Sequence, residues 1–136
     1  MRLAVWQLDV SEWPVAVLAL DRADGDDADF ASFLRCAEEG LARRQRYAIV
    51  IDLTGNKADA RRRAKLASWF ADHRAEAVRY VIAMAVVARN PLERGVMTAM
   101  VWLSPPPFPL EAFATREEAR RWASERVHAA QRAAPP

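Results

Sequence analysis

One short stretch, from Arg46 to Lys57, constrains the fold of this chain more than any other. It reads Arg-Tyr-Ala-Ile-Val-Ile-Asp-Leu-Thr-Gly-Asn-Lys, an apolar run that ends in a polar turn containing a glycine. An apolar run without alternation predicts a strand covered on both faces, as in α/β proteins. Ligands and partners of such sheets lie beyond the carboxyl ends of the strands. We therefore expect any function to lie near Asp52, Thr54, Asn56 and Lys57.

The size and composition of the chain indicate one domain. Its 136 residues, 52% of them hydrophobic, predict a single core formed by residues 1–128, with 129–136 as a frayed tail. The one cysteine, Cys36, cannot form an internal disulfide, which favours a cytoplasmic location. Gln7 and Asp9 interrupt the N-terminal apolar segment, which is therefore unlike a signal peptide. No apolar run reaches the roughly 20 residues of a membrane span, so we expect no membrane association.

Hydrophobic periodicity predicts five strands and four helices in the order β-β-α-β-α-β-α-β-α. The strands are expected at 3–9, 15–20, 47–53, 82–87 and 110–113, with the first two forming a hairpin. The helices are expected to begin at Asp29, at about Asp59, at Asn90 and at Thr115, the second running to Arg79. Short alternating elements of this kind predict an α/β fold with a mixed, mostly parallel sheet.

The spacing of apolar residues also predicts which helix faces turn inward. In the third helix the inward face is expected to hold Leu92, Val96, Ala99, Met100 and Leu103. In the last helix the contact residues are expected to be Ala119, Trp122 and Ala123. Cys36 lies off the main stripe of the first helix, which predicts a partly buried, inert thiol.

The chain lacks the residue patterns of a catalytic site. It has no Gly-x-Ser-x-Gly motif, and its cysteine has no histidine at a suggestive spacing. The two histidines, His73 and His128, are isolated, and the acidic segment 21–29 lacks the spacing of a calcium loop. His73 falls on an apolar helix face, which favours a hydrogen-bonded structural role. We therefore predict no enzyme activity, no metal and no cofactor.

Two surfaces remain as candidates for binding. The first is basic, formed by Arg61 and Arg62 at the start of the second helix with Arg89 and Asn90 after the fourth strand, and it could accept a small anionic group. The near-neutral charge balance, +2 overall, does not favour nucleic acid as its partner. The second is an apolar ledge formed by Trp102 and Phe108 beside a proline run, which could bind a protein or a second copy.

The strand Ile-Val-Ile-Asp-Leu-Thr-Gly at 49–55 resembles the corresponding strand of STAS domains and of the related SpoIIAA-like proteins. The segments Ala-Ser-Trp-Phe at 67–70, Ala-Met-Ala-Val-Val at 83–87 and Arg-Gly-Val-Met-Thr-Ala at 94–99 resemble the SpoIIAA-like branch more closely. The resemblance implies a single SpoIIAA-like domain with four helices. The family's phosphorylatable serine is absent from the matching segment 58–61, so no phosphorylation site is carried over.

Two functional hypotheses follow. The first is a non-enzymatic, bacterial STAS/SpoIIAA-like regulatory module, acting as a homodimer and binding a protein partner through the strand ends and the start of the second helix. The second is a small-molecule or anion binder that uses the carboxyl ends of the parallel strands.

Overall fold

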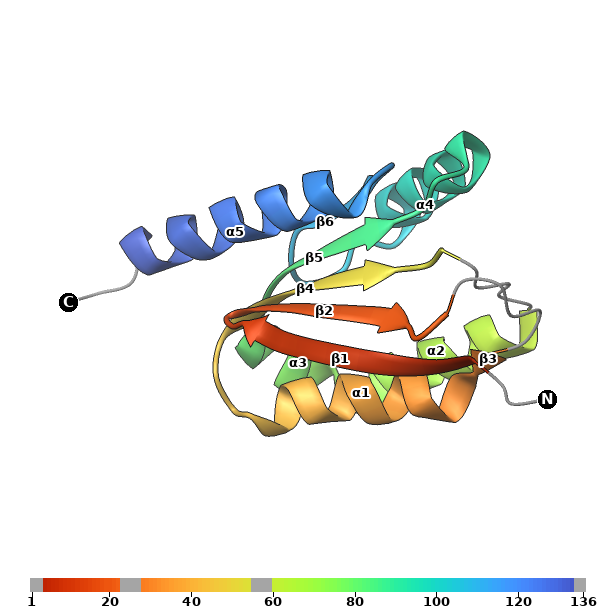
Figure 1. Cartoon of the computed structure of the whole chain (residues 1–136), viewed down its shortest axis with the longest axis horizontal. Coiled ribbons are helices and arrows are strands. Elements are labelled where there is room, and N and C mark those ends of the chain that lie inside the picture. The colour runs from red at the N-terminus through yellow and green to blue at the C-terminus, as the bar shows by residue number, and fades with distance from the viewer. Residues whose placement is uncertain (1–3, 23–27, 55–59, 134–136) are drawn as a thin grey trace.

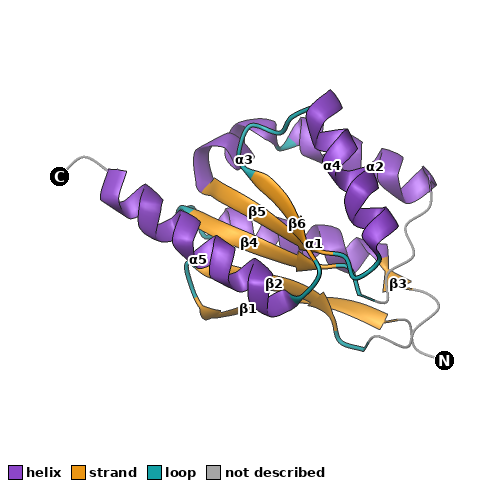
Figure 2. Cartoon of the chain, turned by 90° about the horizontal axis from the view of Figure 1, so that it is seen from above, coloured by secondary structure: helices purple, strands orange, loops and turns teal. Residues whose placement is uncertain are grey.

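The computed structural model describes residues 4–22, 28–54 and 60–133, which form a mixed sheet with helices on both faces (Figures 1 and 2). The strands are β1 (Ala4–Glu12), β2 (Val15–Leu20), β3 (Ala28–Asp29), β4 (Tyr47–Asp52), β5 (Val81–Val87) and β6 (Leu110–Phe113). The helices are α1 (Phe30–Ala42), α2 (Ala60–Asp72), α3 (Arg74–Tyr80), α4 (Pro91–Leu103) and α5 (Arg116–Ala133). The acidic residues at 24, 26 and 27 lie outside the described residues.

The topology confirms the α/β class and the mostly parallel sheet. In the described residues the strand order is β3-β1-β2-β4-β5-β6. β1 and β2 form the expected antiparallel hairpin, and β2, β4, β5 and β6 run parallel. One of the six described strands, β3, was not predicted. It pairs with β1 over only two residues, and a segment of this length is too short to show a hydrophobic period.

The described residues hold five helices where four were predicted, because the second helix breaks at His73. This residue has φ −109° and ψ 12°, outside the helical range, and separates α2 from α3. Its Nδ1 donates to the carbonyl oxygen of Trp69 (2.8 Å), and its ring stacks on the Trp69 indole at 4.1 Å. His73 is thus hydrogen-bonded at the rim of the core. The expected helix cap Asp59 lies outside the described residues.

Alternate residues of the central strands fill two separate cores. On one face, Leu18, Ile49 and Met84 pack against α1 and α3. On the other face, Val50 and Val87 pack against α5. Figure 1 shows α5 on one side of the sheet and α1, α2 and α3 on the other. Two-sided burial of β4 therefore follows from the unbroken apolar run in its sequence.

Alanines on both sides allow α5 to lie close to the sheet. The expected contact residues Ala119 and Ala123 are fully buried, opposite Ala83 and Ala85 of β5. The third, Trp122, is half-buried against Phe113. α5 continues to Ala133, so the frayed tail predicted from residue 129 is wrong over its first five residues.

Side chains of α1 form hydrogen bonds with backbone groups at the outer edge of β1. The helix begins at the predicted position, and Asp29 caps it by accepting from the backbone N–H groups of Ala31 and Ser32. The Ser32 hydroxyl accepts from the Trp6 N–H (2.9 Å), and the Cys36 thiol donates to the Trp6 carbonyl (3.3 Å). Cys36 is consequently more buried than predicted, at 6% exposure, and burial raises the pKa of its thiol.

We expect Gly40→Ala to lower the free energy of unfolding by about 1–3 kcal/mol, the usual cost of overfilling a packed core. A Cβ at Gly40 would lie 2.8 Å from the Tyr47 hydroxyl and 3.1 Å from its ring carbon Cζ. The ring stacks on Trp13 and has little freedom to withdraw. Urea denaturation measures the change.

Gly95→Ala is the matched control, because a Cβ at this helical position meets nothing within 4 Å. It is expected to raise the free energy of unfolding of the single chain, measured at low protein concentration, by about 0.5–1 kcal/mol through helix propensity. Effects of the same sign at the two glycines would contradict the packing described for Gly40.

Candidate functional site

The end of the central strand is occupied by an ion pair between a buried carboxylate, Asp52, and a half-exposed guanidinium, Arg116. Asp52 is only 4% exposed. Its Oδ1 accepts from the Thr54 backbone N–H (2.9 Å), and its Oδ2 accepts from Nε and Nη2 of Arg116 (3.0 and 2.8 Å). The prediction that Asp52 projects towards a partner is therefore wrong, because the first residue of α5 covers it. The sequence shows no signal for this long-range pair.

Two opposing effects set the protonation of Asp52. Burial by itself would raise the pKa of this carboxyl group. The neighbouring Thr54 and the guanidinium of Arg116 outweigh burial and hold the pKa below its usual value of 3.8. Asp52 is thus ionised at neutral pH and tied to Arg116, an arrangement that fixes α5 to β4.

The structure describes only part of the remaining strand-end candidates. Thr54 is half-buried, and among the described residues its hydroxyl has no hydrogen-bond partner. Asn56 and Lys57 lie outside the described residues. Arg61 is exposed and Arg62 half-buried on the first turn of α2.

The two candidates after β5 flank the start of α4. Arg89 is exposed. Asn90 caps α4, as predicted from the sequence, because its side-chain oxygen accepts from the Leu92 N–H (2.8 Å). This bond commits the Asn90 oxygen to the helix rather than to a ligand.

The face of α4 predicted to turn inward lies in solvent. Exposure reaches 75% for Leu92, 52% for Val96, 56% for Met100 and 87% for Leu103, and Ala99 is exposed too. No residue of α4 is buried. The apolar stripe was predicted correctly as a stripe, but its direction was wrong. We call these five residues, with Trp102, the α4 face.

α4 is held by its opposite side and by its first turn. Met97 packs on the core shared with α1 and α3, and Val101 is half-buried. Nη1 of Arg94 donates to the carbonyl oxygens of Ala88 (2.7 Å) and Arg89 (2.9 Å), which anchors the start of the helix. These contacts fix the orientation of α4 and leave its apolar stripe uncovered.

The predicted apolar ledge is half correct. Trp102 is 83% exposed, as expected for a binding ledge. Phe108 is wrong as a member of it, because it is 8% exposed and belongs to the core. The proline-rich segment 105–109 therefore directs Phe108 into the core and leaves Trp102, which precedes it, in solvent.

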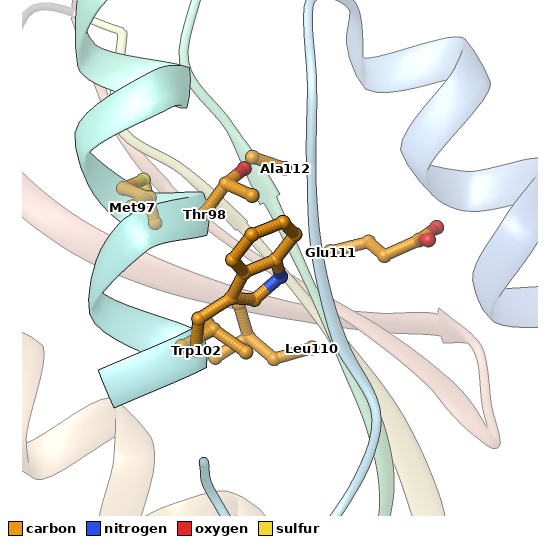
Figure 3. A pocket seen from close by; sticks show the side chains of 7 residues that line it. Met97, Thr98, Trp102, Leu110, Glu111 and Ala112 are labelled. Carbon is orange, nitrogen blue, oxygen red and sulfur yellow. The ribbon is translucent and has the colours of Figure 1, made fainter. Parts of the chain in front are cut away.

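Beside the α4 face lies a shallow hollow of about 300 Å³ between α4 and the edge strand β6. Figure 3 shows the Trp102 indole reaching from α4 towards β6, with the Glu111 side chain directed away from it. Thr98 supplies the hydroxyl among the lining side chains, and this hydroxyl donates to the Arg94 carbonyl oxygen (3.0 Å). The charged group among the described residues that line the hollow is the carboxylate of Glu111, and none of these residues is cationic, so the hollow does not suit an anion.

In the described part of the chain, no three His, Cys, Asp or Glu side chains are grouped to hold a metal ion. None of the described helices has the length and hydropathy of a membrane-crossing helix. Searches against family models, curated proteins and solved structures returned no match for this chain.

We expect Arg116→Ala to lower the free energy of unfolding by about 1–3 kcal/mol. The substitution leaves the buried Asp52 carboxylate without its charged partner, while the exposure of Arg116 itself moderates the loss. The matched control is Arg121→Ala on the same helix, whose pair with Glu117 is solvent-exposed. Its expected effect is below about 0.5 kcal/mol. Similar losses in both variants, measured by urea denaturation, would contradict a special role for Arg116.

The lowered pKa of Asp52 gives a pH dependence with a defined sign. A carboxyl group whose folded-state pKa is depressed stabilises the fold above its unfolded value, 3.8, and loses this contribution as the pH falls through the lowered value. The stability advantage of the wild type over Asp52→Asn should therefore be full at pH 7 and shrink below 3.8. Paired urea titrations measure it, and a difference that grows on acidification would contradict the assignment.

Proposed function

We propose that this chain is a non-enzymatic binding module that docks another polypeptide on the α4 face. The observation that carries the proposal is the exposure of five large apolar side chains on one helix that buries none of its residues: Leu92, Val96, Met100, Trp102 and Leu103. Contiguous apolar surface of this kind on a folded protein typically marks an interaction site.

The free energy available from covering this face is substantial. Weighted by their exposed fractions, the five side chains represent on the order of 5–10 kcal/mol of hydrophobic free energy. Association itself costs about 4–15 kcal/mol in lost translational and rotational freedom. A partner must therefore contribute apolar surface of its own, as a polypeptide does and a small anion does not.

We retain the binding of a protein partner that the STAS and SpoIIAA-like resemblance implies, but we assign it to the α4 face instead of the strand ends. The hairpin followed by parallel strands and intervening helices is compatible with a SpoIIAA-like relationship. Docking at the strand ends has less support, because Asp52 is paired with Arg116 and the side chain of Asn90 is hydrogen-bonded as the cap of α4. A regulatory module of this type would act by binding its partner and not by catalysing a reaction.

A photo-crosslinking amino acid at Met100, introduced in the source organism, tests the proposal. Met100 lies on the α4 face and is 56% exposed. The matched control places the same group at Glu125, which is exposed on α5. We expect a discrete polypeptide adduct from position 100 and only background from position 125. Equal, diffuse labelling from both positions would overturn the proposal.

A further inference from the structure

The spacing of apolar residues on the α4 face is symmetric. Leu92, Val96, Ala99 and Leu103 follow one another at intervals of four, three and four residues. This is the spacing of a short coiled-coil seam, and it reads the same in both directions about the midpoint between Met97 and Thr98. A two-fold axis through that midpoint pairs each residue of the seam with an apolar residue of an antiparallel copy.

The charge pattern also fits a second copy. No charged residue occurs from Gly95 to Leu110, and in α4 only Glu93 and Arg94 carry charge. Arg94 is engaged by the carbonyl oxygens of Ala88 and Arg89. A two-fold contact brings identical groups together, so a seam without charge avoids like-charge repulsion. A helix that lies on a lipid surface typically has a basic polar face, which α4 lacks.

Gly95 gives an independent indication. It lies inside an exposed helix, and a Cβ there would meet nothing within 4 Å, so the fold of the single chain does not require glycine. Gly95 and Trp102 are seven residues apart and flank the seam on the same side. In an antiparallel two-fold pair, the indole of each Trp102 passes over Gly95 of the other copy, where a side chain would obstruct it.

We infer that the occupant of the α4 face is a second copy of this chain, bound through antiparallel pairing of α4 with α4. The inference rests on the proposed function and names its partner. The exposed side chains offer on the order of 500 Å² of apolar surface per copy. A standard interface buries about 800 Å² per partner, so the dimer is expected to be weak, with a Kd of roughly 1–100 µM.

Disulfide trapping in the purified protein tests the arrangement. Ala99 lies next to the two-fold axis, so Ala99→Cys should give a covalent dimer on mild oxidation. The matched control is Leu92→Cys on the same face, whose copies lie about 16 Å apart along the helix axis in this pairing and should not cross-link. The native Cys36 is buried and provides little background. Cross-linking at both positions would overturn the antiparallel pairing.

Sedimentation of the uncross-linked protein provides the second measurement. Ala99→Arg places two like charges beside the axis and should raise the Kd by about 100-fold or more. Ala99 is exposed in the single chain, so its unfolding transition at low concentration should match the wild type. An unchanged Kd would overturn the inference.

The outcomes separate this inference from the proposed function. A purified protein that stays monomeric, with no Ala99→Cys dimer, overturns the inference. The proposed function then stands if the probe at Met100 captures a different polypeptide. If that probe captures nothing, both fail.

Discussion

Burial of β4 on both faces is the constraint on which the rest of the structure depends. All six residues of β4 are buried, so helices must cover the sheet on both sides. α1 and α3 supply one cover and α5 the other. The ion pair between Asp52 and Arg116 joins the end of β4 to the first residue of α5. β4 therefore fixes the positions of the helices on both faces of the sheet. Its polar end, Asp52, binds Arg116 of α5 and not a ligand.

α4 leaves its apolar stripe exposed, and none of its residues is buried. Its inner side contributes Met97 to the core, and Arg94 anchors its start. Covering the apolar stripe on its outer side would require a further layer that the described residues do not supply. Exposure of the α4 face is thus a consequence of how few of the described elements surround the sheet, and the proposed association would supply the missing layer.

The order of the main elements could be predicted from the sequence because periodicity and helix caps are local signals. Asn90 caps the helix that it was expected to cap, and another helix starts at Asp29 as expected. Which stripe faces inward is a property of the whole assembly. The stripe through Val96 has the correct period, yet Met97 lies on the side that meets the core. The pairing of Asp52 with a residue 64 positions away is equally invisible to local patterns.

The contacts of Ser32 and Cys36 with Trp6 have a consequence for the growth of the sheet. An edge strand with free N–H and C=O groups can recruit further strands, which leads to aggregation. At Trp6 these groups are already bonded to side chains of α1. At this position α1 thereby supplies the hydrogen bonds that a neighbouring strand would otherwise make with β1. The β1 border is blocked at this point, and β6 forms the border at the other end of the sheet, beside the α4 face. Blocking of the sheet edge at Trp6 is thus compatible with the recognition that we propose beside the opposite border.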